Sequence, residues 1–144
     1  MWILRAILSR RDGCPPCASH NELMDRLIRL GYWRSETTPD WPDPDAFVDP
    51  GWDAEERHLM SQYFAFGTIA RTFMGRSPCR FCGVANGSVE YTDGTYLWPE
   101  GLVHYLDEHD VRLPSAVVDH ATARLEEAET AVVDDTWWRS LTGP

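Results

Sequence analysis

Hydrophobic residues recur with a helical period in three stretches of the chain. The first follows a capping box, Ser19-His20-Asn21-Glu22, and its apolar positions predict a helix that ends at Gly31. The second begins behind Asp53, a favoured N-cap residue, and keeps the period as far as Gly75, with apolar positions at Leu59, Tyr63, Phe66, Ile69, Ala70 and Phe73. The third begins near Ser115 and runs into the 130s, after which we expect Trp137-Trp138 to fold back onto the body.

Residues 87–98 follow a different pattern, in which apolar and polar positions alternate on both sides of Asp93-Gly94. This dipeptide between alternating residues predicts a β-hairpin. With Asp93-Gly94 as a two-residue turn, Tyr91 pairs with Tyr96 and Val89 pairs with Trp98. The next residue, Pro99, suits the first position of a helix over residues 100–109.

Residues 36–52 contain four prolines among aspartates and tryptophans, which excludes a helix or a central strand there. We expect a loop that its aromatic residues hold in place. Together these elements predict an α+β fold: one domain over residues 1–144, mostly helical, with a single β-hairpin.

The charge is strongly negative and unevenly distributed. The chain has 144 residues and a formal net charge of −10, and its 13 basic residues are all arginine. The absence of lysine excludes Schiff-base and P-loop lysine chemistry, and the acidity argues against a protein that binds nucleic acid through phosphate contacts. No apolar run is long enough to cross a bilayer, and the apolar start, interrupted by Arg5, does not read as a signal peptide. We therefore expect a cytoplasmic protein.

The four cysteines form two C-x2-C pairs, a spacing that favours metal or redox chemistry in a cytoplasmic protein. The second pair and two downstream histidines read C-x2-C-x21-H-x4-H, through Cys79, Cys82, His104 and His109. Two thiolates and two imidazoles suit tetrahedral Zn²⁺, so we expect one zinc ion here. On an ideal helix the two histidines point about 140° apart, so the helix has to end or tighten near His109.

Cys79-Arg80-Phe81-Cys82-Gly83 fits a zinc knuckle, a tight turn that presents both sulfurs to one point. The order of knuckle, hairpin and helix over residues 77–110 resembles a CCHH zinc finger. The resemblance is one of spacing and element order. It implies a closed, four-ligand zinc site that stabilises the fold.

The first pair, Cys14 and Cys17, has three possible roles at this stage. In the first, they form a second metal site with His20 and with His58 as a fourth ligand. In the second, they are a redox-active dithiol. In the third, they are partners of the Cys79–Cys82 pair. Inert thiols are the simplest alternative.

Residues 35–56 carry eight acidic residues and no basic one. Acids between aromatic residues suit a basic protein partner, although the same acids also keep a proline-rich loop soluble. The leading hypothesis is a zinc-stabilised adaptor, regulator or immunity-type protein without catalysis; the alternatives are a small zinc-dependent hydrolase and an oxidoreductase that uses Cys14 and Cys17. The residues expected to contact the partner are Trp41, Asp43, Asp45, Phe47 and Trp52.

Overall fold

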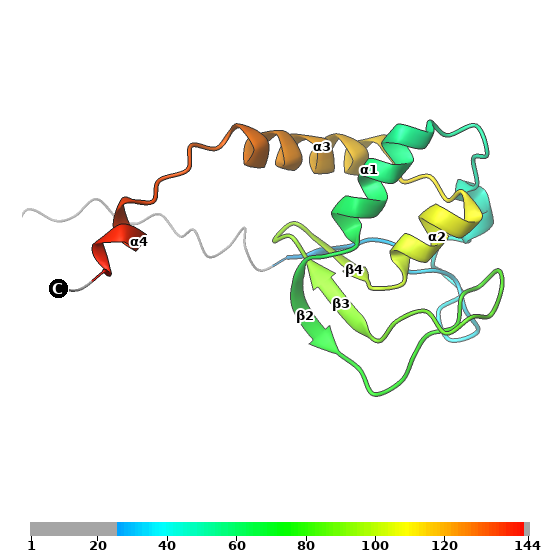
Figure 1. Cartoon of the computed structure of the whole chain (residues 1–144). Coiled ribbons are helices and arrows are strands. Elements are labelled where there is room, and N and C mark those ends of the chain that lie inside the picture. Colours follow the sequence, from blue (N-terminus) through cyan, green and yellow to red (C-terminus); the bar gives the residue numbers. More distant parts are fainter. Residues whose placement is uncertain (1–25, 143–144) are drawn as a thin grey trace, which may run out of the picture.

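The computed structural model describes residues 26–142, in which helices and a four-stranded sheet are combined (Figure 1). The α+β class is confirmed, but the prediction of a mostly helical protein is wrong, because 38% of the described residues are helical and 16% are strand. In chain order the elements are β1 (Ile28–Arg29), the 3-10 helix η1 (Pro44–Phe47), α1 (Ala54–Phe64), β2 (Thr68–Thr72), β3 (Val89–Thr92), β4 (Tyr96–Pro99), α2 (Leu102–His109), α3 (Ser115–Thr130) and α4 (Thr136–Ser140).

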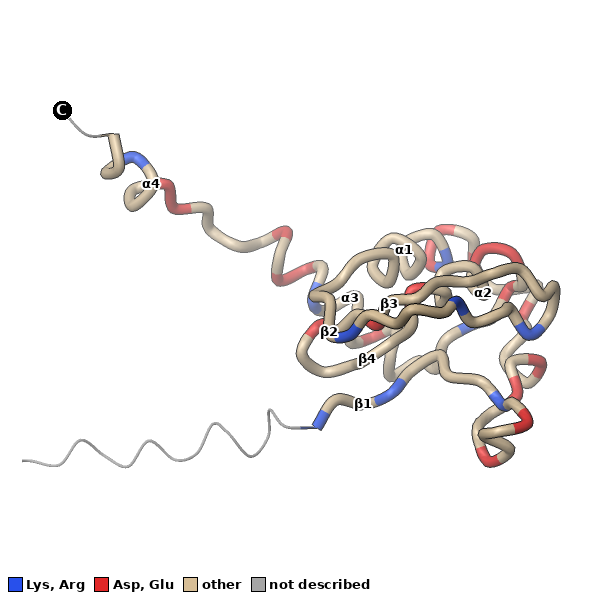
Figure 2. The backbone as a smooth tube through the Cα atoms, turned by 90° about the horizontal axis from the view of Figure 1, so that it is seen from below, with Lys and Arg blue, Asp and Glu red and all other residues tan. Residues whose placement is uncertain are grey.

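The sheet has the order β1-β4-β3-β2. The β3–β4 hairpin forms its centre, β2 adds an antiparallel strand on one side, and β1 adds a short parallel strand on the other. Figure 2 shows arginines on the two outer strands, β1 and β2, whereas the acidic positions lie mainly in the helices and loops. The described part of the chain contains no helix long and apolar enough to cross a membrane.

The predicted hairpin is confirmed, with a register that differs by two residues. Tyr91 lies opposite Trp98 and Thr92 opposite Leu97, so four residues separate the members of the last pair instead of two. Because the shift is even, the side chains keep the faces that the sequence predicts. The hairpin is also longer than expected at its far end, because Pro99 ends β4 and α2 begins only at Leu102.

The helix predicted from Asp53 to Gly75 is correct only in its first half. Asp53 caps α1 by accepting hydrogen bonds from the backbone N–H groups of Glu55 and Glu56, but the helix ends at Phe64 and the chain continues as β2. The carbonyl of Phe64 accepts a hydrogen bond of 2.9 Å from the buried indole of Trp98. Thr68–Thr72 is rich in β-branched residues and pairs with β3, and this pairing outweighs the helical spacing of its apolar positions.

The helix predicted over residues 19–31 is likewise wrong in the part that the structure describes; residues 19–25 lie outside it. The backbone N–H groups of Ile28 and Leu30 donate to the carbonyls of Thr95 and Leu97, which makes Ile28–Arg29 a strand. For residues 28–30, the hydrogen bonds to β4 outweigh the helical spacing of the apolar residues.

The core lies between the hairpin and helices α1, α2 and α3. Trp98 is fully buried and packs edge-to-face on Phe64, with ring centroids 5.0 Å apart. The other fully buried large side chains come from α1, α2 and the loop after α2: Met60, Leu102, Leu106 and Val111. The hairpin face that carries Trp98 is therefore the face covered by helices.

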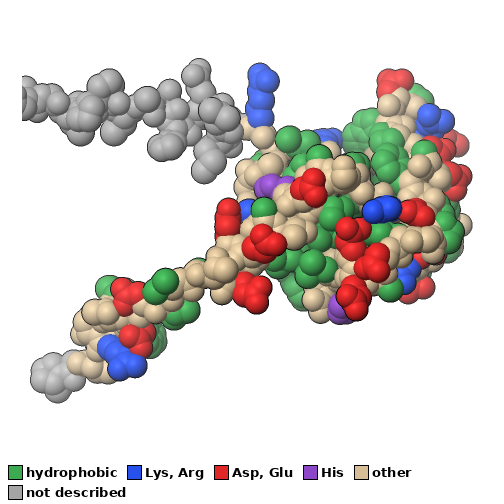
Figure 3. Space-filling model, turned by 90° about the horizontal axis from the view of Figure 1, so that it is seen from above, with side chains coloured by type: hydrophobic (Ala, Val, Ile, Leu, Met, Phe, Trp, Pro, Cys, Tyr) green, Lys and Arg blue, Asp and Glu red, His purple; other side chains and the backbone are tan. Residues whose placement is uncertain are grey.

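The predicted C-terminal helix is confirmed as α3, but the prediction that Trp137-Trp138 folds back is wrong. Both tryptophans lie on α4, where they are 71% and 69% exposed, and α4 projects away from the body beyond the end of α3 (Figure 1). The space-filling view from above shows hydrophobic side chains on this projecting segment (Figure 3). Its apolar residues do not contribute to the core.

The carboxylate of Asp93, at the tip of the hairpin, joins three elements. It accepts hydrogen bonds from the Tyr63 hydroxyl of α1 at 2.7 Å and from the backbone N–H of Tyr96 at 2.7 Å, and it pairs with His120 of α3 at 2.9 Å. Burial alone would raise the pKa of Asp93, but these hydrogen bonds outweigh burial and hold its pKa below the usual range.

Replacing Asp93 with asparagine should lower the free energy of unfolding at pH 7 by about 1–3 kcal/mol, because buried donors lose a charged acceptor. A carboxyl whose pKa is depressed by folding stabilises the fold above its unfolded pKa and loses this contribution as the pH falls through the folded pKa. The difference between wild type and Asp93→Asn should therefore be constant down to about pH 5 and shrink below about pH 4. Urea unfolding of both proteins at each pH measures it, with Asp119→Asn, on the exposed side of α3, as the matched control. A difference that does not change with pH would contradict the prediction.

Candidate metal centre

The segment between β2 and β3 forms the predicted knuckle. The backbone N–H of Cys79 donates to the Val84 carbonyl at 2.8 Å, and that of Gly83 donates to the Cys79 carbonyl at 2.9 Å. Gly83 has φ +71°, a left-handed conformation that glycine adopts without strain. The turn therefore curls back on itself and brings the Cys79 and Cys82 sulfurs to the same side.

Helix α2 supplies the two histidines. Its last residue is His109, and the next residue, Asp110, is left-handed and caps the helix through its N–H on the Tyr105 carbonyl. The helix thus ends where the spacing of the histidines requires, and the ring nitrogens Nε2 of His104 and His109 lie 3.2 Å apart.

The four donor atoms lie close enough together to share one metal ion. Cys79 Sγ lies 3.4 Å from His109 Nε2, Cys82 Sγ lies 3.3 Å from His104 Nε2, and all four atoms lie within 4.8 Å of one another. Zn–S bonds of about 2.3 Å and Zn–N bonds of about 2.0–2.1 Å place neighbouring donors of a tetrahedron about 3.3–3.8 Å apart. The predicted set of Cys79, Cys82, His104 and His109 is therefore brought together, and it could hold a metal ion.

The surroundings of the cluster favour the thiolate that a metal requires. Cys79 is 3% exposed, and this burial raises the pKa of its thiol, but hydrogen bonds from the backbone N–H groups of Cys82 and Phe81 prevail and lower it. The Phe81 ring packs on the His109 ring at 4.7 Å and shields that side of the cluster.

Sequence reasoning missed Tyr105, which lies between the two histidines on α2. Its side chain is buried, and its hydroxyl accepts a hydrogen bond of 2.8 Å from the backbone N–H of Arg80. Burial raises the pKa of Tyr105 to about 12, so the hydroxyl is neutral at physiological pH. Tyr105 thus fixes the knuckle to α2 independently of a metal. Its place next to His104 was the only signal in the sequence.

The second predicted site is not assembled in the described part of the chain. Cys14, Cys17 and His20 lie outside the described residues, so their roles stay predictions. His58 is exposed on α1 and does not belong to the four-residue cluster.

The five residues expected to contact a partner occupy different environments. Trp52 is 4% exposed and belongs to the core, and Phe47 packs on Trp33 with ring centroids 5.5 Å apart. Trp41 is half-buried, Asp43 caps η1 through the N–H of Asp45, and Asp45 is exposed. The aromatic residues therefore hold the acidic loop on the body, as predicted, and leave Trp41 and the aspartates accessible.

Comparison of the chain with protein-family models, with curated proteins and with solved structures gives no match. Any functional conclusion therefore depends on the residues of this chain.

Proposed function

We propose that this protein is a non-enzymatic binding protein in which a Zn²⁺ ion stabilises the fold and an acidic loop binds a basic protein partner. The observation that carries the proposal is that the four donor atoms of Cys79, Cys82, His104 and His109 lie within 4.8 Å of one another. Two thiolates and two imidazoles form a donor set that is typical of zinc.

A structural role for the ion follows from the number of donors. A catalytic zinc keeps one position for water, whereas four protein ligands complete its tetrahedral coordination. The cluster also joins the loop between β2 and β3 to α2, and the hydrogen bonds from Arg80 to Tyr105 and from Asn86 to Gly101 connect the same two segments. This arrangement supports stabilisation of the fold and disfavours the hydrolase alternative.

The acidic loop supplies the surface for a partner. Asp49 and Glu56 pair with Arg112, but within the described residues Asp43, Asp45 and Asp53 have no ion pair. Carboxylates without an ion pair, in the same loop segment as the half-buried Trp41, would attract a basic surface, and the tryptophan ring would supply apolar contact.

We expect the triple variant Trp41→Ala, Asp43→Asn, Asp45→Asn to lose its partner. Affinity capture from cells that produce this protein, with quantitative mass spectrometry, compares the wild type with this variant. The matched control, Glu126→Gln with Glu129→Gln, removes the same charge from the exposed end of α3. A basic protein that is retained by the wild type and the control but reduced about tenfold or more by the triple variant supports the proposal. Equal capture by all three proteins contradicts it.

A further inference from the structure

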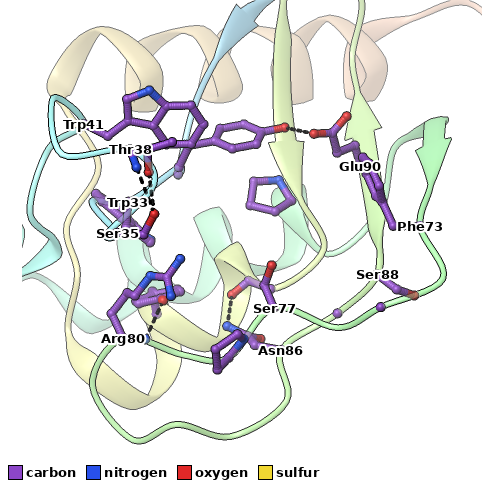
Figure 4. A pocket seen from close by; sticks show the side chains of 18 of the residues that line it. Trp33, Ser35, Thr38, Trp41, Phe73, Ser77, Arg80, Asn86, Ser88 and Glu90 are labelled. Carbon is purple, nitrogen blue, oxygen red and sulfur yellow. Dashed lines mark hydrogen bonds between the residues drawn. The ribbon is translucent and has the colours of Figure 1, made fainter.

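A pocket separate from the metal cluster lies between the loop that follows β1 and the loop that joins β2 to β3 (Figure 4). It has a volume of about 320 Å³, which is within the range of small-molecule sites. One wall comes from residues 31–41, the other from residues 73–90, and Gly101 and Tyr105 close it on the side of α2.

Aromatic rings form much of the lining. The rings of Tyr32 and Trp41 meet edge-to-face with centroids 5.2 Å apart, and Trp33, Phe73 and Tyr105 supply further flat surfaces. Such walls favour a planar ligand, because aromatic rings that pack on one another contribute more binding free energy than their buried area alone provides.

Two buried polar atoms of the lining lack a hydrogen-bond partner in the described chain. They are the indole Nε1 of Trp33, whose residue is 8% exposed, and the carboxylate Oε2 of Glu90, whose residue is 6% exposed. The other oxygen of Glu90 accepts from the Tyr32 hydroxyl at 2.6 Å, and Oε2 has only an ionic contact of 3.5 Å with Arg71. Buried polar groups are normally paired, so each of these pocket-lining residues has one hydrogen bond unmade: Glu90 as an acceptor and Trp33 as a donor.

The lining also contains one cation, Arg80, whose guanidinium makes no hydrogen bond or ion pair with the described residues. Its backbone is held by Tyr105, and its side chain points towards the loop that carries Ser35 (Figure 4). A guanidinium in this position is suited to a carboxylate or phosphate group.

We propose that this pocket binds a small planar anion: a heteroaromatic ring with an N–H donor for Glu90 and a carboxylate or phosphate group for Arg80. The ring lies against Tyr32 and Trp41. Two kinds of molecule share this chemistry, a nucleoside monophosphate and a heteroaromatic carboxylate. The inference goes beyond the binding of a protein partner, and it concerns a different part of the surface.

Isothermal titration of the metal-loaded full chain tests the proposal with two anionic probes, guanosine monophosphate and indole-3-acetate. Each has a neutral counterpart without the anionic group, guanosine and indole. We expect one of the two anions to bind saturably and its counterpart to bind at least about tenfold more weakly. The anion that binds shows whether the ligand is a nucleoside monophosphate or a heteroaromatic carboxylate. Absence of saturable binding by both anions would overturn the proposal.

Arg80→Gln should remove the preference for the anion, so that the anionic probe and its neutral counterpart bind alike. Arg76→Gln is the matched control, because Arg76 lies on the same loop, is exposed, and does not line the pocket. Glu90→Gln should weaken the anion and the neutral molecule together. If that variant fails to fold, Trp33→Phe keeps an aromatic ring but removes the indole N–H, and it should also weaken both. The proposal would be overturned if Arg80→Gln, Glu90→Gln and Trp33→Phe all left the binding of both probes unchanged. Zinc content measured on each sample separates this outcome from loss of the metal site.

Discussion

Replacing His104 with alanine is expected to release the metal ion and to lower the midpoint of thermal unfolding by about 10 °C or more. The reason is linkage: an ion that binds only the folded chain stabilises it by about 4 kcal/mol when its free concentration is 1,000 times the dissociation constant. A chelator added to the wild type should produce a similar shift. Elemental analysis and calorimetry measure the two effects on the same samples.

The matched control is His58→Ala, because His58 is an exposed histidine outside the cluster. This variant should have the same metal content and the same unfolding midpoint as the wild type. Retention of the ion by His104→Ala, or an unchanged midpoint after its loss, would disprove the stabilising role of the cluster. Analysis of Cys14→Ser with Cys17→Ser then shows whether a second ion depends on the N-terminal pair.

The second large effect is expected in the core, at Trp98. This side chain is fully buried against Phe64, so truncation to alanine should lower the free energy of unfolding by about 3–5 kcal/mol. Urea denaturation measures the change. Trp137→Ala is the matched control, and because its ring is 71% exposed, its effect should stay within about 0.5 kcal/mol.

Trp98→Phe separates the aromatic packing of this side chain on Phe64 from the hydrogen bond that its indole N–H donates. It keeps an aromatic ring but leaves the Phe64 carbonyl without the indole N–H, which should cost about 1–3 kcal/mol. If Trp98→Ala and Trp137→Ala destabilise the protein equally, the hairpin does not pack against α1 as the structure shows.

The metal cluster was predictable because its chemistry is local in sequence. Cys79 and Cys82 lie on one turn, and a single hairpin separates that turn from the helix with the two histidines. Asp93-Gly94 indicated the hairpin for the same reason, although the exact register depended on contacts outside it. Even the stop of α2 at His109 followed from the requirement that two imidazoles reach one ion.

Elements that depend on distant partners were not predictable in this way. Ile69 and Phe73 continue the helical spacing of α1, yet Thr68–Thr72 pairs with β3. The sequence around residues 68–72 does not show that a partner strand is available. The same is true of β1, whose two residues bond to β4 from almost seventy positions away. The pocket was hidden for the same reason, because Trp33, Arg80 and Glu90 come from three separate segments.

Arg80 lies between Cys79 and Cys82 in the chain and lines the pocket with its side chain. One short turn therefore contributes to both proposed sites, so a ligand that orders this turn at one site should lower the entropic cost of binding at the other. Thermodynamics requires this effect to be mutual: if the ion increases the affinity of the pocket by some factor, an occupied pocket increases the affinity for the ion by the same factor. If both proposals hold, the occupancy of each site should therefore depend on the availability of the other ligand.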